Sequence, residues 1–152
     1  MSLKEKLQSD LTEAIRARDE VRSGTIRMIL TAVKNEEVAG KTVRELSDSE
    51  LITVLSREAK KRREAAEAFD QAGATSRADA ERAEGVVIAA YLPAQLSEAE
   101  LLEMITEAIK SSGASGPAAM GLVMKTLQPK VAGRADGGTV SALVKAALAG
   151  GI

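Results

Sequence analysis

The chain has 152 residues, which fits one average domain or two small ones, and it contains neither Cys nor His. This composition excludes disulfides, thiolate chemistry and thiolate metal sites, and it removes the commonest general base near neutral pH and the commonest metal ligand. The 21 basic and 22 acidic residues give a net charge of −1, which excludes a strongly basic nucleic-acid binder and leaves room only for a local basic patch.

Apolar residues recur at helical spacing through the first part of the chain and predict four helices before about residue 94. Ser2 with Glu5 and Ser47 with Glu50 have the spacing of a capping box, so we expect a helix to begin at each pair. A short break is expected at residues 19–24, between the first two helices.

The segment Tyr91–Leu96 reads as a linker because it contains a proline at the end of a helical pattern. A third capping pair, Ser97 with Glu100, follows it, and three more helices are expected after that pair. No stretch shows the alternation of a strand. The sequence therefore predicts an all-α fold, with an N-terminal helical bundle at residues 1–94 and a small three-helix C-terminal domain at residues 95–152.

A basic segment, Arg57–Glu64, has five basic residues in eight. It could be a phosphate-binding stripe, or an exposed helix face with ion pairs such as Glu58 with Arg62 and Arg63 with Glu67. Because successive helical positions differ by about 100°, the five bases cannot share one side. We therefore favour the structural interpretation.

The region from Ser112 onward carries four cations and one anion, Asp136, for a local net charge of +3. Its glycine-rich segment, residues 132–138, precedes a predicted helix, and free N–H groups at a helix start attract phosphate. The segment lacks the G-K-[ST] of a P-loop, and many such loops are only turns. The candidate nucleic-acid contacts are Lys125, Lys130, Gly133, Arg134, Gly137, Gly138 and Lys145.

Two residues of the Met120–Lys130 stretch are unusual for a helix. Gly121 lowers the stability of a helix by about 1 kcal/mol relative to Ala, so we expect a close neighbour to offset that loss. As that neighbour, a packed helix is favoured over a bound RNA backbone. Pro129 is expected to break the chain again.

No polar residues have the spacing of a catalytic constellation. Carboxylate pairs such as Glu81 with Glu84 arise by chance on charged amphipathic helices, and nothing places them in an apolar pocket. The sequence predicts no catalytic residue, no cofactor and no metal site. The segment Met1–Leu7 lacks the apolar core of a signal peptide, and no apolar run could span a bilayer, so we expect a cytoplasmic protein without membrane contact.

Four stretches together resemble the stand-alone members of the GatB/YqeY family: Ile29–Glu36, Arg62–Phe69, Tyr91–Ser97 and Met120–Gly137. The likeness covers essentially the full length in the same order. One departure follows Gly73, where the family tends to continue with Arg and a nearby Asp-Leu. Here residues 74–76 precede Arg77, and Asp79 is followed by Ala80.

The resemblance implies an all-α fold and a relation to the tail of the GatB component of the tRNA-dependent amidotransferase. In that enzyme, which uses glutamine as the nitrogen donor, the tail helps to hold tRNA, while phosphorylation and amidation occur in a separate preceding domain. This chain is too short to contain that domain. The implied partners are tRNA and, beside it, an amidotransferase or other tRNA-handling protein.

Three hypotheses follow for the function. The first is a non-catalytic tRNA-binding or accessory module. The second is an accessory component of a glutamine-dependent carbon–nitrogen ligase, which family resemblance alone supports. The third is a helical protein-interaction adaptor without RNA contact, favoured by the net charge of −1 and by the presence of only two aromatic residues, Phe69 and Tyr91.

Overall fold

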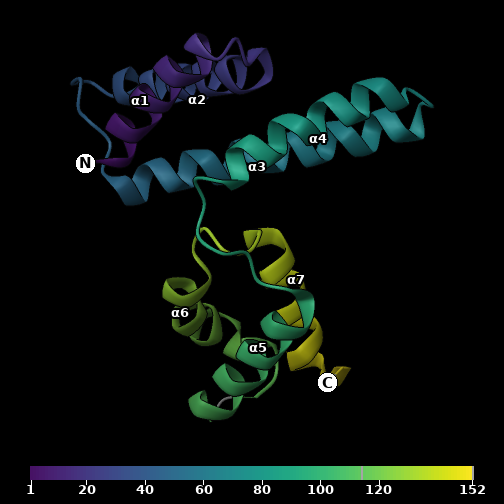
Figure 1. The fold of residues 1–152 in the computed structure, drawn as a ribbon. Coiled ribbons are helices and arrows are strands. Elements are labelled where there is room, and N and C mark those ends of the chain that lie inside the picture. The colour runs from purple at the N-terminus through teal and green to yellow at the C-terminus, as the bar shows by residue number, and fades with distance from the viewer. Residues whose placement is uncertain (114, 152) are drawn as a thin grey trace. The chain divides into compact units, whose positions relative to one another are not determined.

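The computed structural model describes residues 1–113 and 115–151, and all regular secondary structure in that part is helical (Figure 1). The helices form two compact units, Met1–Leu92 (unit 1) and Pro93–Ile152 (unit 2). Unit 1 contains α1 (Leu3–Arg16), α2 (Glu20–Val38), α3 (Asp48–Gln71) and α4 (Thr75–Ala89). Unit 2 contains α5 (Glu98–Ser112), the 3-10 turn η1 (Pro117–Ala119), α6 (Met120–Val131), α7 (Gly137–Ala146) and the π-helical turn η2 (Ala147–Gly151). The predicted all-α fold is confirmed, whereas the assignment of residues 1–94 and 95–152 as separate domains stays a prediction.

The predicted helix starts are confirmed at α1, α3 and α5. The Ser2 side chain accepts the Glu5 N–H at 3.2 Å, and the Glu5 carboxylate accepts the Ser2 N–H at 2.8 Å. Ser47 and Glu50 form the same reciprocal pair before α3. Ser97 accepts the Glu100 N–H at 3.1 Å before α5. Each cap satisfies N–H groups that a helix start would otherwise leave unbonded.

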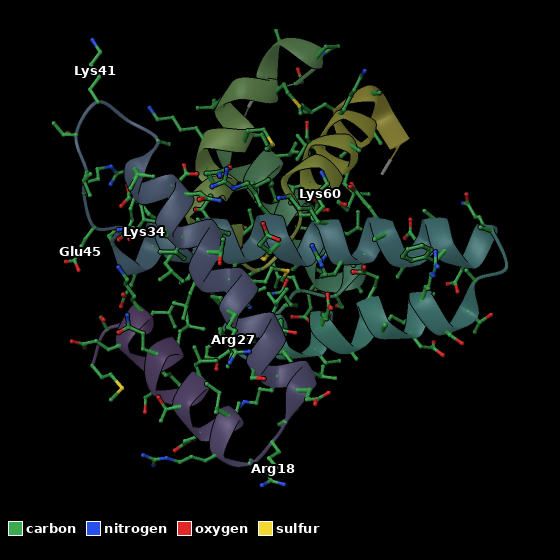
Figure 2. The ribbon with its side chains drawn as sticks, turned by 90° about the horizontal axis from the view of Figure 1, so that it is seen from above. Arg18, Arg27, Lys34, Lys41, Glu45 and Lys60 are labelled. Carbon is green, nitrogen blue, oxygen red and sulfur yellow. The ribbon has the colours of Figure 1, made fainter. Side chains whose placement is uncertain are left out.

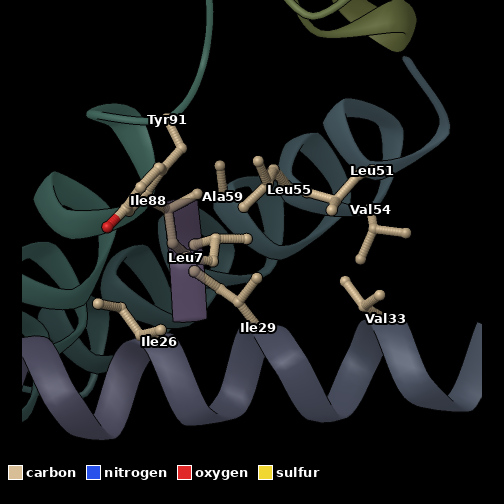
Figure 3. Packing of buried hydrophobic residues seen from close by; sticks show 10 residues of the cluster. All are labelled: Leu7, Ile26, Ile29, Val33, Leu51, Val54, Leu55, Ala59, Ile88 and Tyr91. Atoms are coloured by element: carbon tan, nitrogen blue, oxygen red, sulfur yellow. The ribbon is translucent and has the colours of Figure 1, made fainter. Parts of the chain in front are cut away.

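Unit 1 is held by one apolar core to which all four of its helices contribute. α1 lies beside α2, and α3 and α4 form a long antiparallel pair (Figure 1). Leu7 of α1 points into the space between α2 and α3, and Ile88 and Tyr91 close the core from the end of α4 (Figure 3). The buried residues of this core are Leu7, Ile26, Ile29, Val33, Leu51, Val54, Leu55, Ala59, Ile88 and Tyr91.

Unit 2 has a smaller core of its own, built by the inner faces of α5, α6 and α7. Its buried residues are Leu101, Ile105, Ala108, Val123, Leu127, Val131, Val140 and Val144. Residues 113–116 lie between α5 and η1 in the sequence, and residue 114 lies outside the described residues. Pro117 is the first residue of η1, as expected for a proline whose missing N–H costs nothing there.

Three local predictions are wrong. α2 begins at Glu20, so the break between the first two helices is shorter than residues 19–24 and Gly24 lies inside a helix. α6 continues through Pro129 to Val131, because Leu127 and Val131 are both buried in the core of unit 2 and hold the last turn in place. No described atom outside the local backbone lies within 4 Å of the position that a Cβ on Gly121 would take, so no packed helix explains that glycine.

Candidate nucleic-acid interface

The glycine-rich segment is a tight turn between α6 and α7. The N–H groups of Arg134 and Ala135 both donate to the Val131 carbonyl, at 2.8 and 3.1 Å. Gly133 has φ +73°, a left-handed conformation that residues with a Cβ rarely adopt. Gly133 is therefore required by the turn itself, whatever it binds.

The same turn is fastened to the segment that precedes α5. The Gln95 side-chain amide donates to the Gly133 carbonyl at 2.8 Å, and the Arg134 Nε donates to the Ala94 carbonyl at 3.0 Å. A backbone bond of 2.9 Å from the Leu96 N–H to the Arg134 carbonyl completes the connection. Sequence reasoning assigned Arg134 to phosphate and missed this structural role. Arg134 retains its two terminal guanidinium nitrogens for other contacts.

Asp136 caps the start of α7. Its carboxylate accepts the Thr139 N–H at 3.0 Å and the Thr139 hydroxyl at 3.1 Å. Gly137 and Gly138 are exposed and form the first turn of this helix. Because the Asp136 carboxylate already complements the positive end of the helix, a phosphate approaching Gly137 and Gly138 meets a negative charge beside the free N–H groups.

Three of the predicted cations are exposed lysines: Lys125 and Lys130 on α6, and Lys145 in the last turn of α7. None of them forms an ion pair within 4 Å with a described residue. Lys130 stands five positions after Lys125, which turns their side chains about 140° apart around α6. The structure therefore gathers the glycines and Arg134 in one turn but spreads the lysines over the two helices.

Acidic residues of unit 2 lie almost entirely on α5. Its exposed side chains include Glu98, Glu100, Glu103 and Glu107. The one cation of this helix is Lys110, which is also exposed. Unit 2 thus has an acidic helix and two helices whose charged side chains are basic.

A family model described as "Yqey-like protein" matches residues 4–148, nearly the whole chain. The chain belongs to the YqeY-like family. The match covers both units and all seven candidate contact residues, so it bears out the resemblance that the four sequence stretches indicated. No curated protein gives a match to the chain.

The basic segment of this YqeY-like protein, Arg57–Glu64, lies on α3, where ion pairs engage several of its cations. Arg57 contacts Glu36 of α2 at 3.5 Å, and Lys61 contacts Glu58 at 3.0 Å. Arg62 lies 3.6 Å from Glu58, as predicted. The predicted pair of Arg63 with Glu67 does not form within 4 Å, and both of these described side chains are exposed.

Arg62 also connects the two long helices of unit 1. Its guanidinium lies 3.4 Å from the Glu81 carboxylate and 2.9 Å from the Glu84 carboxylate of α4. Only about 20% of the Arg62 side chain is exposed. This arrangement supports the structural interpretation of the segment, because its most buried cation serves the packing of α3 against α4.

A buried polar contact that the sequence did not indicate joins Tyr91 to Asp10 of α1. The Tyr91 hydroxyl donates to Asp10 at 2.6 Å, and Lys6 and Arg22 lie 2.9 and 3.6 Å from the same carboxylate oxygen. The hydrogen bond from Tyr91, followed by that from Lys6, lowers the pKa of Asp10. Burial, together with the bond to Asp10, raises the pKa of Tyr91 to about 12. This contact holds the end of α4 on α1.

The described residues contain no group of three or more acidic side chains placed to hold a metal ion. None of the described helices combines the length and the apolar character that a membrane span requires.

Proposed function

We propose that the chain is a non-catalytic module that binds tRNA, alone or beside an amidotransferase or another tRNA-handling protein. The observation that carries the proposal is the set of three lysines on α6 and α7, Lys125, Lys130 and Lys145. All three are exposed and unpaired within the described residues, and they lie in a region of net charge +3. Lysines in this state can neutralise RNA phosphates without breaking contacts of the fold. Membership of the YqeY-like family supports the same ligand, given the family's resemblance to the amidotransferase tail.

The candidate contacts take different parts in this proposal. The lysines supply most of the attraction to phosphate. Arg134 contacts phosphate through its terminal guanidinium nitrogens only, since its Nε donates a hydrogen bond to the Ala94 carbonyl. Gly137 and Gly138 allow the RNA backbone to approach closely, while Asp136 weakens the attraction of the helix end. The four glutamates of α5 repel phosphate and direct the RNA toward α6 and α7.

The test is tRNA binding by the full chain over a series of salt concentrations. If at least four phosphates are neutralised, log K for the wild type falls with log salt at a slope of about −3 or steeper. Replacing the three lysines with Gln should make the slope less steep by about 2, because three phosphate contacts are lost. Arg134 is left intact, since its replacement would also release the segment before α5.

Lys110→Gln is the matched control, because it removes an exposed lysine from the acidic helix of the same unit. It should bind tRNA as the wild type does. The proposal fails if the wild type shows no salt-sensitive binding of tRNA. For the role of the three lysines, an unchanged slope in the triple variant would be decisive against it.

A further inference from the structure

Unit 1 carries a row of four cations along the outer side of α2, which we call the cation row: Arg18, Arg27, Lys34 and Lys41. Figure 2 looks onto this side and shows the four side chains following α2 from the turn before it to the loop after it. All four are exposed, and none of these side chains forms a hydrogen bond or an ion pair within 4 Å with a described residue. Glu45 is the labelled acid beside the row.

The outer side of α2 is free of acids along most of its length. Residues 21–35 include no Asp or Glu, and Arg27, Thr31 and Lys34 are exposed on the side opposite the core residues Ile26, Ile29 and Val33. Lys34 stands seven positions after Arg27, which places them on one side of the helix about 10 Å apart along its axis. Two cations therefore point the same way from a rigid element.

Arg18 stands in a backbone conformation that disfavours arginine. It is the one described residue other than glycine with positive φ, at +57°. The position directly follows the C-cap of α1, where glycine is the usual residue because it has no Cβ to clash. The backbone holds this conformation, because the Asp19 N–H donates to the Ala14 carbonyl at 2.9 Å and the Arg18 N–H donates to the Ile15 carbonyl at 3.1 Å. The Arg18 side chain takes no part in these bonds, so its guanidinium is available to a ligand.

Gly24 is another residue that its place in the backbone disfavours. It lies in the interior of α2, one turn before Arg27, where Ala would make a more stable helix. No described atom outside the local backbone lies within 4 Å of the position that its Cβ would take. A glycine without a packing neighbour, next to unpaired cations, leaves space for the backbone of a ligand.

We infer that the cation row binds the sugar–phosphate backbone of RNA, with Arg27 and Lys34 on separate phosphates and Gly24 at the point of closest approach. An acidic protein surface fits less well, because protein interfaces have an apolar or aromatic centre and the middle of this face has none. The inference rests on the proposed function, since it takes the same RNA as ligand, and it gives that RNA a second contact surface on unit 1.

The experiment compares three forms of the full chain for tRNA binding over a salt series. The test variant is Arg27→Gln with Lys34→Gln. The matched control is Arg63→Gln with Arg77→Gln, which removes two exposed cations from α3 and α4 without touching an ion pair of the described residues; Arg77 also lies over the Phe69 ring, 5.9 Å from its centroid. We expect the test variant to lose affinity by on the order of tenfold, with a salt slope less steep by about 2, and the control to stay within about twofold of the wild type. Both should unfold at the temperature of the wild type, which excludes a folding defect.

A second variant, Gly24→Glu, adds an acid one turn before Arg27, in the stretch of α2 that has none, and should weaken binding as strongly as the double variant. Equal binding by the double variant and the wild type would overturn the inference while leaving the proposed function intact. Salt-insensitive binding by the wild type would overturn the proposed function and the inference together. If polyglutamate binds the chain in a manner that requires Arg27 and Lys34 while tRNA does not, the partner is an acidic protein and the inference is wrong.

Discussion

The two units use their charged residues in different ways. In unit 1, ion pairs connect the helices: Lys4 with Glu37 joins α1 to α2, and Arg62 with Glu84 joins α3 to α4. In unit 2, the helices are joined by apolar packing, and its four lysines form no ion pair within 4 Å with a described residue. The charges of unit 1 therefore contribute to the fold, whereas the lysines of unit 2 are available to a ligand.

This difference separates two kinds of cation within a chain whose net charge is close to zero. A cation that contacts an acid gains little from an RNA phosphate, because it must first give up that acid. An exposed cation without a partner keeps its full attraction for phosphate. The cation row is the part of unit 1 that behaves like unit 2. Replacing paired charges should therefore reduce stability, and replacing unpaired charges should reduce RNA binding.

The largest effect on stability is expected from the buried contact of unit 1. Asp10→Ala removes the acceptor of the Tyr91 hydroxyl and leaves Lys6 and Arg22 without their carboxylate, so the free energy of unfolding should fall by about 3 kcal/mol. Tyr91→Phe should lower the free energy of unfolding by about 1 kcal/mol, because the Asp10 carboxylate still contacts Lys6 and Arg22. Urea unfolding measures both. A change below about 1 kcal/mol for Asp10→Ala would show that this contact does not hold α4 on α1.

A smaller loss of stability is expected at Arg62, which contacts acids from two helices. Arg62→Met should lower the free energy of unfolding by about 2 kcal/mol, since Glu81 and Glu84 lose their cation close to the buried Glu58. The control is Arg82→Met. Arg82 joins the same two helices through Asp70 and is about half exposed, so its loss should cost less than about 1 kcal/mol. Equal losses in the two variants would contradict the role given to Arg62.

The acid sensitivity of the chain should originate in unit 1. The pKa of Asp10 is lowered first by the Tyr91 hydroxyl, that of Glu37 by Lys4, and that of Glu50 by Arg44, in the last case to about 2. A carboxyl whose pKa is lower in the folded state stabilises the fold above its unfolded pKa, and this stabilisation disappears as the pH falls through the folded value. Stability should therefore decrease from about pH 4 toward pH 2.

Tyr91 offers a direct probe of this transition. It is the single tyrosine of a chain without tryptophan, so tyrosine fluorescence reports on unit 1. In Asp10→Asn, the change in melting temperature between pH 4 and pH 2 should be smaller than in the wild type. At alkaline pH the dependence of stability on pH has the opposite sign. Tyr91, whose pKa is raised to about 12, stabilises the fold fully below pH 10, and this contribution is lost as the pH rises toward 12.

The parts of the fold that the sequence predicted correctly depend on residues close together in the chain. The capping boxes at Ser2 and Ser47 span three residues, and their hydrogen bonds form as expected. Two features that the sequence did not predict depend on contacts across the fold. Pro129 remains helical because the core of unit 2 holds its neighbours, and the bond from Tyr91 to Asp10 joins residues 81 positions apart. No local pattern contains such information.

The candidate site shows the same division. The exposure of Lys125, Lys130 and Lys145 follows from helical periodicity and was predictable. The bond from Arg134 to Ala94 spans 40 positions and was not. The cation row was also missed, because Arg18 and Gly24 are ordinary residues in the sequence. Only the positive φ of Arg18 and the open space beside Gly24 show that another residue at either position would make the fold more stable.

The smallest effect is expected from exchanging residues at two of the left-handed turns, Arg18 in unit 1 and Gly133 in unit 2. Arg18→Gly should raise the free energy of unfolding by about 1 kcal/mol, because it removes a Cβ from a conformation that disfavours one. Gly133→Ala should lower it by about the same amount. Urea unfolding measures both, and tRNA binding is measured beside it. If Arg18 belongs to an RNA-binding surface, the more stable Arg18→Gly protein should bind tRNA a few times more weakly. A variant that is more stable and binds equally well would show that Arg18 is not retained for RNA, and the cation row would then reduce to the residues of α2 and the loop after it.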